Sequence, residues 1–215
     1  MTTLLHVSAS PRGAHSESLA IADSFLGEFR RAHPDVDIDI FDLWDGTLPP
    51  FGPAAAAAKM TVFAGADPED DEAKAWDAAR ATFERFATAD LYLFSVPMWN
   101  AGIPYILKQF IDVVSQPGMV FGFDATSGYL GLLTGKKAAV IYTSAVYGPG
   151  RGPAFGNDFQ SAYFMDWLNW AGIADVTDIE FRPNLATADA EQGRRVAHER
   201  ARAVAADFRT LALRG

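Results

Sequence analysis

The sequence predicts an α/β protein with a doubly wound, five-stranded parallel sheet, strand order 2-1-3-4-5 and helices on both faces. The first observation is that strand-like apolar runs alternate with helical patterns along the 215 residues, which is typical of an α/β sandwich with right-handed crossovers. The second is that the first, third and fourth runs are almost continuously apolar, as in strands covered by helices on both faces. The third is that no repeat or linker divides the chain. We therefore expect a single domain over residues 1–215, with ligands bound beyond the carboxyl ends of strands one, three and four.

The predicted strands are short and separated by turn-forming residues. They are Thr3–Val7, Val36–Phe41, Leu91–Val96, Ala138–Thr143 and Val176–Phe181. The second alternates apolar with acidic residues, so we expect it at an edge of the sheet.

The predicted helices carry apolar residues three and four positions apart, which gives each helix one face that packs on the sheet. They are Glu17–Arg31, Asp71–Ala87, Tyr105–Val114, Phe159–Ala171 and Asp189–Leu211. Asp189 and Gln192 have the spacing of a capping box, and the alanine run Ala54–Ala58 is expected to belong to a further helix. Two long connections, Ser115–Lys137 and Ala145–Asp158, contain aromatic residues and glycines, so we interpret them as functional and not disordered.

Composition and charge exclude several classes of protein. The net charge is −9 and no basic stripe is present, so no nucleic-acid partner is expected. The absence of cysteine excludes disulfides, thiolate catalysis and cysteine-ligated metals, and the four scattered histidines lack metal-ligand spacing. No apolar run has the ~18 residues of a membrane span, and the first residues lack the basic and apolar parts of a signal peptide. We expect a cytoplasmic protein with no metal and no membrane partner.

A turn rich in hydroxyl groups, Ser8–Ser18, joins the first strand to the first helix. Free N–H groups at a helix N-terminus bind anions. The hydroxyls of Ser10, Ser16 and Ser18 add donors, and a hydrogen bond to a charged group is worth roughly 1.5–3 kcal/mol. The turn therefore fits a phosphate, while Ser16 or Ser18 also fits a plain helix cap.

Two other phosphate-binding motifs are excluded. The segment Gly131–Lys137 has too few residues between its glycines for a Walker A loop, lacks a hydroxyl residue after the lysines and precedes a strand, so we interpret it as a tight turn. No G-x-G-x-x-G follows the first strand, which disfavours a Rossmann-type NAD site.

The segment after the third strand carries the most specific signal. It reads Pro-Met-Trp-Asn over residues 97–100 and Gly-Ile-Pro-Tyr-x-Leu-Lys-x-Phe-Ile-Asp over residues 102–112. This pattern strongly resembles the FMN-dependent NADH-azoreductases, which belong to the flavodoxin-like NAD(P)H:quinone oxidoreductases. The resemblance runs from the Ser10 turn to Ser144 and, more weakly, to Trp167, so it covers most of the chain.

The resemblance implies a flavodoxin-like domain that binds one FMN per subunit of a homodimer. The serine turn is implied to hold the FMN phosphate, and two later segments the ribityl chain and the isoalloxazine ring. The implied cofactor-binding residues are Ser10, Ser16, Glu17, Ser18, Met98, Trp99, Asn100, Ala101, Ser144, Ala145, Val146 and Tyr147. The resemblance also implies that two protomers form each active site, with Phe121 and Phe123 lining a substrate pocket at the partner's flavin. No side chain is assigned a catalytic role, because the flavin N5 carries the hydride.

Two departures from the family pattern affect the site. The family often has an aromatic residue after the motif asparagine, where this chain has Ala101. The third segment is commonly Ser-Arg-Gly-Gly, where this chain has Ser144-Ala145-Val146-Tyr147. The contact of this loop with the ring and its effect on substrate access therefore stay open, with Tyr147 as the candidate to lie against the ring.

The implied activity is transfer of two electrons from NADH or NADPH to quinones and aromatic azo compounds by a ping-pong mechanism. The sequence does not decide between the two donors and does not name the physiological acceptor. The acidic net charge also fits a flavodoxin-like electron carrier without its own small-molecule acceptor, although the two aromatic loops favour an enclosed pocket. A hydrolase that uses Ser10 or Ser144 is a third alternative, but the chain lacks a G-x-S-x-G elbow.

Overall fold

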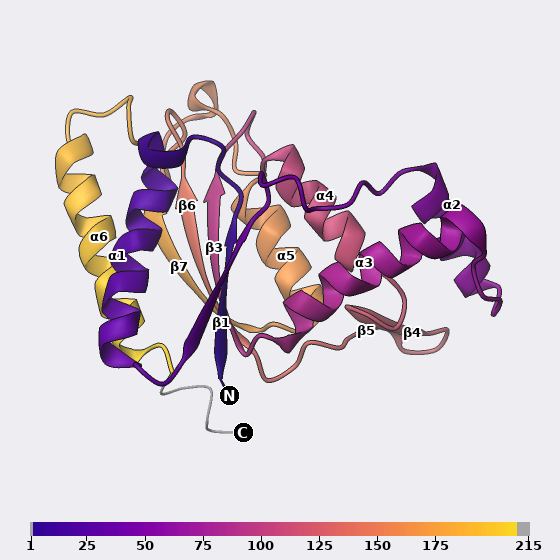
Figure 1. The fold of residues 1–215 in the computed structure, drawn as a ribbon. Coiled ribbons are helices and arrows are strands. Elements are labelled where there is room, and N and C mark those ends of the chain that lie inside the picture. The colour runs from indigo at the N-terminus through magenta and orange to yellow at the C-terminus, as the bar shows by residue number, and fades with distance from the viewer. Residues whose placement is uncertain (1, 210–215) are drawn as a thin grey trace.

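The computed structural model describes residues 2–209 and has a five-stranded parallel sheet at its centre (Figure 1). The strands of this sheet are β1 (Thr3–Ser8), β2 (Asp37–Asp42), β3 (Leu91–Pro97), β6 (Lys137–Thr143) and β7 (Asp175–Phe181). Their order is β2-β1-β3-β6-β7, and every neighbouring pair is parallel. Counted among these strands alone, this is the order 2-1-3-4-5, so the predicted fold class is confirmed and the second strand lies at an edge.

The register brings the ends of β1, β3 and β6 to one level. Ser8 pairs with Ser95, and one residue beyond, the Ala9 N–H donates to the Ser95 carbonyl at 3.1 Å. On the other side of β3, the Met98 N–H donates to the Thr143 carbonyl at 2.7 Å. The loops after these three strands therefore leave the sheet together at its carboxyl edge.

Helices cover both faces of the sheet (Figure 1). On one face lie α1 (Glu17–Ala32) and α6 (Ala190–Asp207), and on the other α3 (Asp70–Thr88), α4 (Tyr105–Val114) and α5 (Ser161–Ala171). The helix α2 (Pro53–Phe63), which contains the predicted alanine run, packs against α3 and extends beyond the sheet. The predicted helices are confirmed to within a few residues. The helix predicted over Asp189–Leu211 corresponds to α6, and Leu211 itself lies outside the described residues. Among residues 2–209, none of the helices combines the length and the apolar character needed to cross a membrane.

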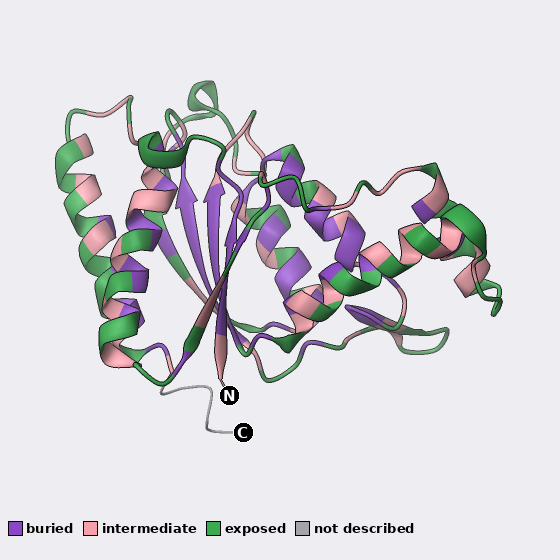
Figure 2. Ribbon diagram, in the orientation of Figure 1, coloured by how far each residue is buried: buried purple, intermediate pink, exposed green. Residues whose placement is uncertain are grey.

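The apolar core forms two clusters, one on each face of the sheet (Figure 2). Under α1 and α6, Phe25 and Phe208 meet edge to face with ring centroids 5.2 Å apart. Under α3, α4 and α5, the Phe86 ring lies 5.3 Å from Phe110 and 6.0 Å from Trp167. Each such side chain contributes roughly 1.5–3 kcal/mol when it is buried, so these clusters hold the strands in place.

The long connection after α4 contains a hairpin that the sequence did not predict. It consists of the antiparallel strands β4 (Phe121–Asp124) and β5 (Gly128–Gly131). Four-residue strands are too short to give a periodic signal. The turn is formed by the Asp124 carboxylate, whose Oδ1 accepts hydrogen bonds from the N–H groups of Thr126 and Ser127, each at 2.9 Å.

The predicted capping box at the start of α6 is wrong. The Asp189 side chain accepts no hydrogen bond from the first turn of the helix. Its own N–H donates to the Thr187 hydroxyl at 3.4 Å, and the Gln192 side-chain Oε1 accepts a hydrogen bond from Arg195. The preceding turn satisfies the N–H that a capping box would use, so the correct spacing alone did not produce the motif.

Candidate functional site

Ser10 lies in the loop after β1 and has an unpaired hydroxyl. The residue is 4 % exposed, and its Oγ makes no hydrogen bond with any residue between 2 and 209. A buried hydroxyl without a partner costs about 1–3 kcal/mol. A ligand oxygen bound at this loop would remove that cost.

Ser16 and Ser18 stand at the beginning of α1. The Ser16 Oγ accepts a hydrogen bond from the Leu19 N–H at 3.3 Å and lies 3.1 Å from the Ser18 Oγ. Ser16 is therefore the helix cap that the sequence allowed. A cap of this kind leaves the N–H groups of Glu17 and Ser18 without partners inside the helix, and such groups attract anions. The cap and the phosphate interpretations are thus compatible.

The Glu17 carboxylate is held by α6. Arg194 donates from Nη2 to Oε1 at 2.7 Å and from Nε to Oε2 at 3.2 Å. This ion pair offsets the negative charge that Glu17 would otherwise place beside the serine hydroxyls.

Residues 99–102 form a tight turn after β3. Trp99 and Gly102 exchange two backbone hydrogen bonds of 2.9 Å, and the central residues Asn100 and Ala101 have φ values of 49° and 69°. Positive φ at both central positions is typical of a type I′ turn, which asparagine tolerates and alanine disfavours. The Phe159 N–H donates to the Ala101 carbonyl at 3.0 Å, so a second loop supports the tip of the turn.

The loop after β6 is closed by hydrogen bonds to its backbone. The Ser144 hydroxyl donates to the Tyr147 carbonyl. Arg151 donates to the Val146 carbonyl at 2.8 Å and to the Ala186 carbonyl at 2.6 Å. These bonds fix the segment Ser144–Tyr147, where Ser-Ala-Val-Tyr stands in place of the Ser-Arg-Gly-Gly of the resembled family.

The three segments meet at a cavity of about 200 Å³, called here the serine cavity. The predicted site residues that line it are Ser10, Ser16, Glu17, Met98, Trp99, Ser144 and Ala145. The topology explains this meeting, because all three loops leave the same edge of the sheet.

The remaining predicted cofactor residues lie around the serine cavity and do not line it. They are Ser18, Asn100, Ala101, Val146 and Tyr147. Ser18 is fully buried, with its hydroxyl next to that of Ser16, and Val146 is exposed. The Tyr147 ring lies against the Arg182 guanidinium, with the centroid 5.4 Å from Cζ.

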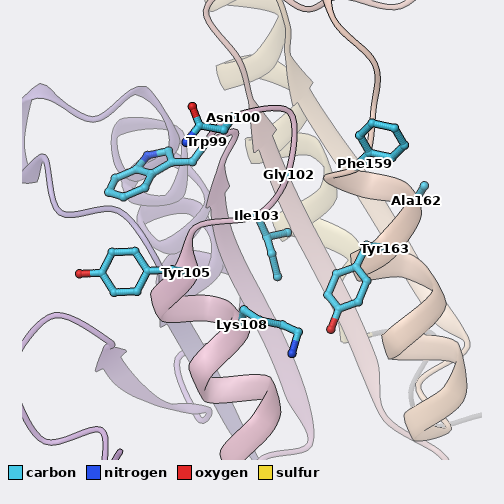
Figure 3. A pocket seen from close by; sticks show the side chains of 9 residues that line it. All are labelled: Trp99, Asn100, Gly102, Ile103, Tyr105, Lys108, Phe159, Ala162 and Tyr163. Atoms are coloured by element: carbon cyan, nitrogen blue, oxygen red, sulfur yellow. The ribbon is translucent and has the colours of Figure 1, made fainter.

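A larger cavity of about 620 Å³, called here the apolar cavity, also uses Trp99 (Figure 3). One wall comes from the turn after β3 and the first turns of α4, and consists of Trp99, Asn100, Gly102, Ile103, Tyr105 and Lys108. The opposite wall comes from the start of α5 and consists of Phe159, Ala162 and Tyr163. Figure 3 shows Lys108 and Tyr163 facing each other across the opening. Trp99 lines both cavities, so the two cavities adjoin at this residue.

Phe121 and Phe123 reach neither of these cavities within one chain. The Phe121 ring lies 4.7 Å from Trp170 and borders a third cavity of about 400 Å³. Phe123 is 62 % exposed. Their hairpin lies away from the carboxyl edge of the sheet (Figure 1).

Several residues at the serine cavity were not assigned from the sequence. Arg12 and His15 line it from the turn before α1, and Asn184 and Leu185 line it from the loop after β7. The position of Asn184 and Leu185 follows from topology, because every strand of a parallel sheet ends at the same edge. The loop after the fifth strand of the sheet therefore contributes to the same cavity as the loops after the first, third and fourth.

Trp44, in the loop after β2, was also missed. Its indole Nε1–H donates to the Ala9 carbonyl at 3.1 Å, and its ring lies 5.9 Å from Trp99 and 5.3 Å from Tyr105. Trp44 thus connects the serine turn to the turn after β3. No local motif marks it, since both contacts depend on the fold.

Known proteins with similar sequences and structures point to one family. A family model described as flavodoxin-like fold matches residues 2–205. A protein of Ruegeria pomeroyi named FMN-dependent NADH:quinone oxidoreductase is 46 % identical over 193 residues, covering 90 % of this chain and 95 % of that protein. A protein of Nitratidesulfovibrio vulgaris with the same name is 38 % identical over 210 residues, covering 97 % of this chain and 100 % of that protein.

A solved structure agrees with these matches. The crystal structure of an azoreductase from Bacillus anthracis is 27 % identical and superimposes with a TM-score of 0.89, covering 97 % of this chain and 100 % of that one. The sequence relatives, the family model and the strand order are consistent with one another. The chain therefore belongs to the flavodoxin-like family of FMN-dependent NADH:quinone oxidoreductases.

Proposed function

We propose that this protein is an enzyme that binds FMN and passes two electrons from NADH or NADPH to quinones or aromatic azo compounds. The observation that carries the proposal is the unpaired, buried Ser10 hydroxyl, which opens into the serine cavity beside the N-terminus of α1. The names of the relatives support FMN as the cofactor and a quinone as the acceptor.

The serine cavity fits the phosphate of FMN. The Ser10 hydroxyl needs a partner, the first N–H groups of α1 favour an anion, and Arg12 and His15 line the same space. The Glu17 carboxylate, which would repel a phosphate, is paired with Arg194. We assign the phosphate to Ser10, Ser16 and the N–H groups of Glu17 and Ser18.

The ribityl chain and the ring are assigned to the neighbouring segments. A cavity of about 200 Å³ is smaller than the ~300–1,000 Å³ of typical ligand sites, so it suits the phosphate end. The ring extends toward Met98, Trp99, Asn100 and Ala101. The Ser144–Tyr147 loop borders it from the other side.

When bound, FMN supplies the two-electron chemistry, taking a hydride equivalent from the nicotinamide and returning it to the acceptor. The apolar cavity offers aromatic surfaces of Trp99, Phe159 and Tyr163 to a planar ring. We place the nicotinamide and the acceptor there in turn, which is a ping-pong mechanism. A quinone that gains the hydride equivalent also gains a proton, which we assign to solvent.

We further propose a homodimer in which Phe121 and Phe123 line the partner's substrate pocket. The support is the exposed aromatic surface of the hairpin, where Phe123 is 62 % and Tyr129 61 % exposed. Light scattering on an eluting size-exclusion peak measures the mass directly. A mass of one chain at all accessible concentrations would contradict the dimer.

The visible absorption spectrum of the purified protein tests the main proposal. Oxidised-flavin bands that bleach with NADH in the absence of oxygen and return with menadione are expected. The absence of flavin bands after incubation with FMN and desalting would overturn the proposal. Parallel lines in double-reciprocal plots at several menadione concentrations are expected for the ping-pong mechanism, and intersecting lines would exclude it.

An electron carrier is the second candidate, favoured by the net charge of −9. A carrier would bind FMN yet oxidise NADH slowly with menadione in the absence of a reductase. The apolar cavity next to Trp99 favours the enzyme, since a carrier requires no apolar cavity for a small acceptor.

A further inference from the structure

The two walls of the apolar cavity are joined by hydrogen bonds from residues 158–160, which we call the latch. The Phe159 N–H donates to the Ala101 carbonyl at 3.0 Å, at the tip of the turn after β3. The Gln160 Nε2 donates to the Val96 carbonyl at 2.7 Å, and Gln160 is fully buried. The start of α5 is therefore attached at two points to the segment that forms the opposite wall.

Asp158 orders the latch. Its Oδ1 accepts hydrogen bonds from the N–H groups of Gln160 at 3.0 Å and Ser161 at 2.8 Å, and its Oδ2 accepts from the Ser161 hydroxyl. Burial raises the pKa of Asp158, but the Ser161 hydrogen bonds and Arg182 outweigh burial, so its pKa lies below the ordinary value. Asp158 is thus ionised when it holds α5 and the latch.

Arg182, just beyond the end of β7, forms an ion pair with Asp158. Its Nη1 donates to the Asp158 Oδ2 at 2.9 Å, and its other ion-pair partner is Glu180. The Arg182 side chain is only 2 % exposed, and its Cζ lies 5.2 Å from the Tyr142 ring centroid and 5.4 Å from that of Tyr147. A buried, planar guanidinium close to two aromatic rings has little freedom, so it fixes the position of the carboxylate.

We propose that Arg182 is a positioning residue that sets the width of the apolar cavity by holding Asp158 and, through the latch, Phe159. This inference rests on the proposed function, in which the acceptor occupies that cavity. Arg182 itself lines neither the serine cavity nor the apolar cavity. It therefore acts on the acceptor only through other residues.

Asp158→Asn tests the proposal most cleanly. The amide oxygen can still accept hydrogen bonds from the start of α5, while the ion pair with Arg182 is lost. We expect the KM for menadione to rise about tenfold, with kcat and the Kd for FMN within about twofold of wild type. Glu180→Gln is the matched control, because it removes a carboxylate from the same arginine without touching the latch, and it should leave the KM unchanged.

Two measurements do not depend on turnover. Quenching of tryptophan fluorescence by menadione reports acceptor binding at Trp99 and should weaken by about the same factor as the KM. Hydrogen exchange of the peptide that contains Phe159 and Gln160 should be faster in Asp158→Asn than in Glu180→Gln. Arg182→Met combined with Asp158→Asn completes a double-mutant cycle, in which the double variant should be no worse than the more impaired single variant.

The outcomes separate the two proposals. A wild-type protein that neither binds nor reduces menadione would overturn the proposed function, and the positioning role with it. A functional wild type with an unchanged KM in Asp158→Asn would overturn the positioning role alone. A merely structural role would lower the folded fraction, and hence kcat, at constant KM. If Asp158→Asn does not fold, Gln160→Met removes the other end of the latch, and an unchanged KM in that variant would contradict the proposal.

Discussion

Arg194 on α6 binds both carboxylate oxygens of Glu17, the first residue of α1, at 2.7 and 3.2 Å. The acidic side chain nearest the proposed phosphate site is therefore neutralised by a helix from the other end of the chain. We predict that Arg194→Met weakens FMN binding about two- to fivefold, because an uncovered carboxylate at a helix N-terminus opposes an anion. Titration followed by flavin fluorescence at low and high salt measures the effect, which should shrink when the charges are screened.

The double variant Glu17→Gln with Arg194→Met is the control for this electrostatic explanation. It removes the carboxylate together with its partner and should restore nearly wild-type affinity. Equal FMN affinity in wild type and Arg194→Met at low salt would show that Glu17 does not influence the phosphate.

The serine turn gives the second prediction. Ser10→Ala combined with Ser16→Ala should raise the Kd for FMN at least about tenfold, because both hydroxyls line the serine cavity and a hydrogen bond to a charged group is worth roughly 1.5–3 kcal/mol. Activity at saturating FMN should fall far less. Ser24→Ala is a suitable control, since Ser24 lies on the same helix but pairs with His198 at 2.7 Å. Unchanged FMN affinity in the double variant would remove the phosphate assignment.

The sheet could be predicted because burial on both faces leaves a strong signal in single strands. All seven residues of β6 are buried, and β1 and β3 are nearly so. The hairpin β4–β5 could not be predicted, because its side chains are mostly exposed and its turn depends on the single carboxylate of Asp124. Patterns of burial thus predict only those elements that the core itself requires.

The candidate site, like the fold, could be predicted only in part. Ser10 and Trp99 were predicted to belong to one site, because the fold brings the ends of β1 and β3 together. Trp44 and Arg182 were not predicted, since their roles come from contacts with Ala9 and Asp158 that no local spacing encodes. Tyr147 illustrates the limit of a motif: the sequence suggested a ring contact, and the structure places its side chain beside Arg182. Whether it also touches FMN stays a prediction.

The strained turn after β3 gives the third prediction. Ala101 has a φ of 69°, a region that costs an L-residue roughly 1–2 kcal/mol and costs glycine nothing. Ala101→Gly should therefore stabilise the fold by about 1 kcal/mol, after allowance for the greater freedom of glycine in the unfolded chain. Ala64→Gly, at an exposed residue with a φ of −77°, should instead leave stability unchanged or lower. Urea unfolding of the wild type, Ala101→Gly and Ala64→Gly measures the three free energies of unfolding. Equal changes in the two variants would contradict the proposed strain at Ala101.

A buried histidine in β1 gives the fourth prediction. His6 is 4 % exposed, its Nε2 lies 2.8 Å from the Ser95 Oγ, and its Nδ1 has no partner among the described residues. Burial lowers the pKa of His6 from 6.5 to about 4, because the imidazolium would lose its hydration. The folded protein therefore holds His6 neutral at a pH where the unfolded chain binds a proton.

This difference makes stability fall as the pH drops through the window between the two pKa values. Below about pH 6.5 His6 binds a proton in the unfolded state, whereas in the folded state it becomes protonated only near pH 4. His6 should thus account for a loss of about 2 kcal/mol between about pH 7 and pH 5. His6→Gln keeps a group that can bond Ser95 but does not titrate. Its free energy of unfolding should decline less steeply over that range, and the difference between the two proteins cancels the contributions of the carboxylates. Parallel pH profiles for wild type and His6→Gln would mean that His6 is protonated without cost inside the sheet, which its burial contradicts.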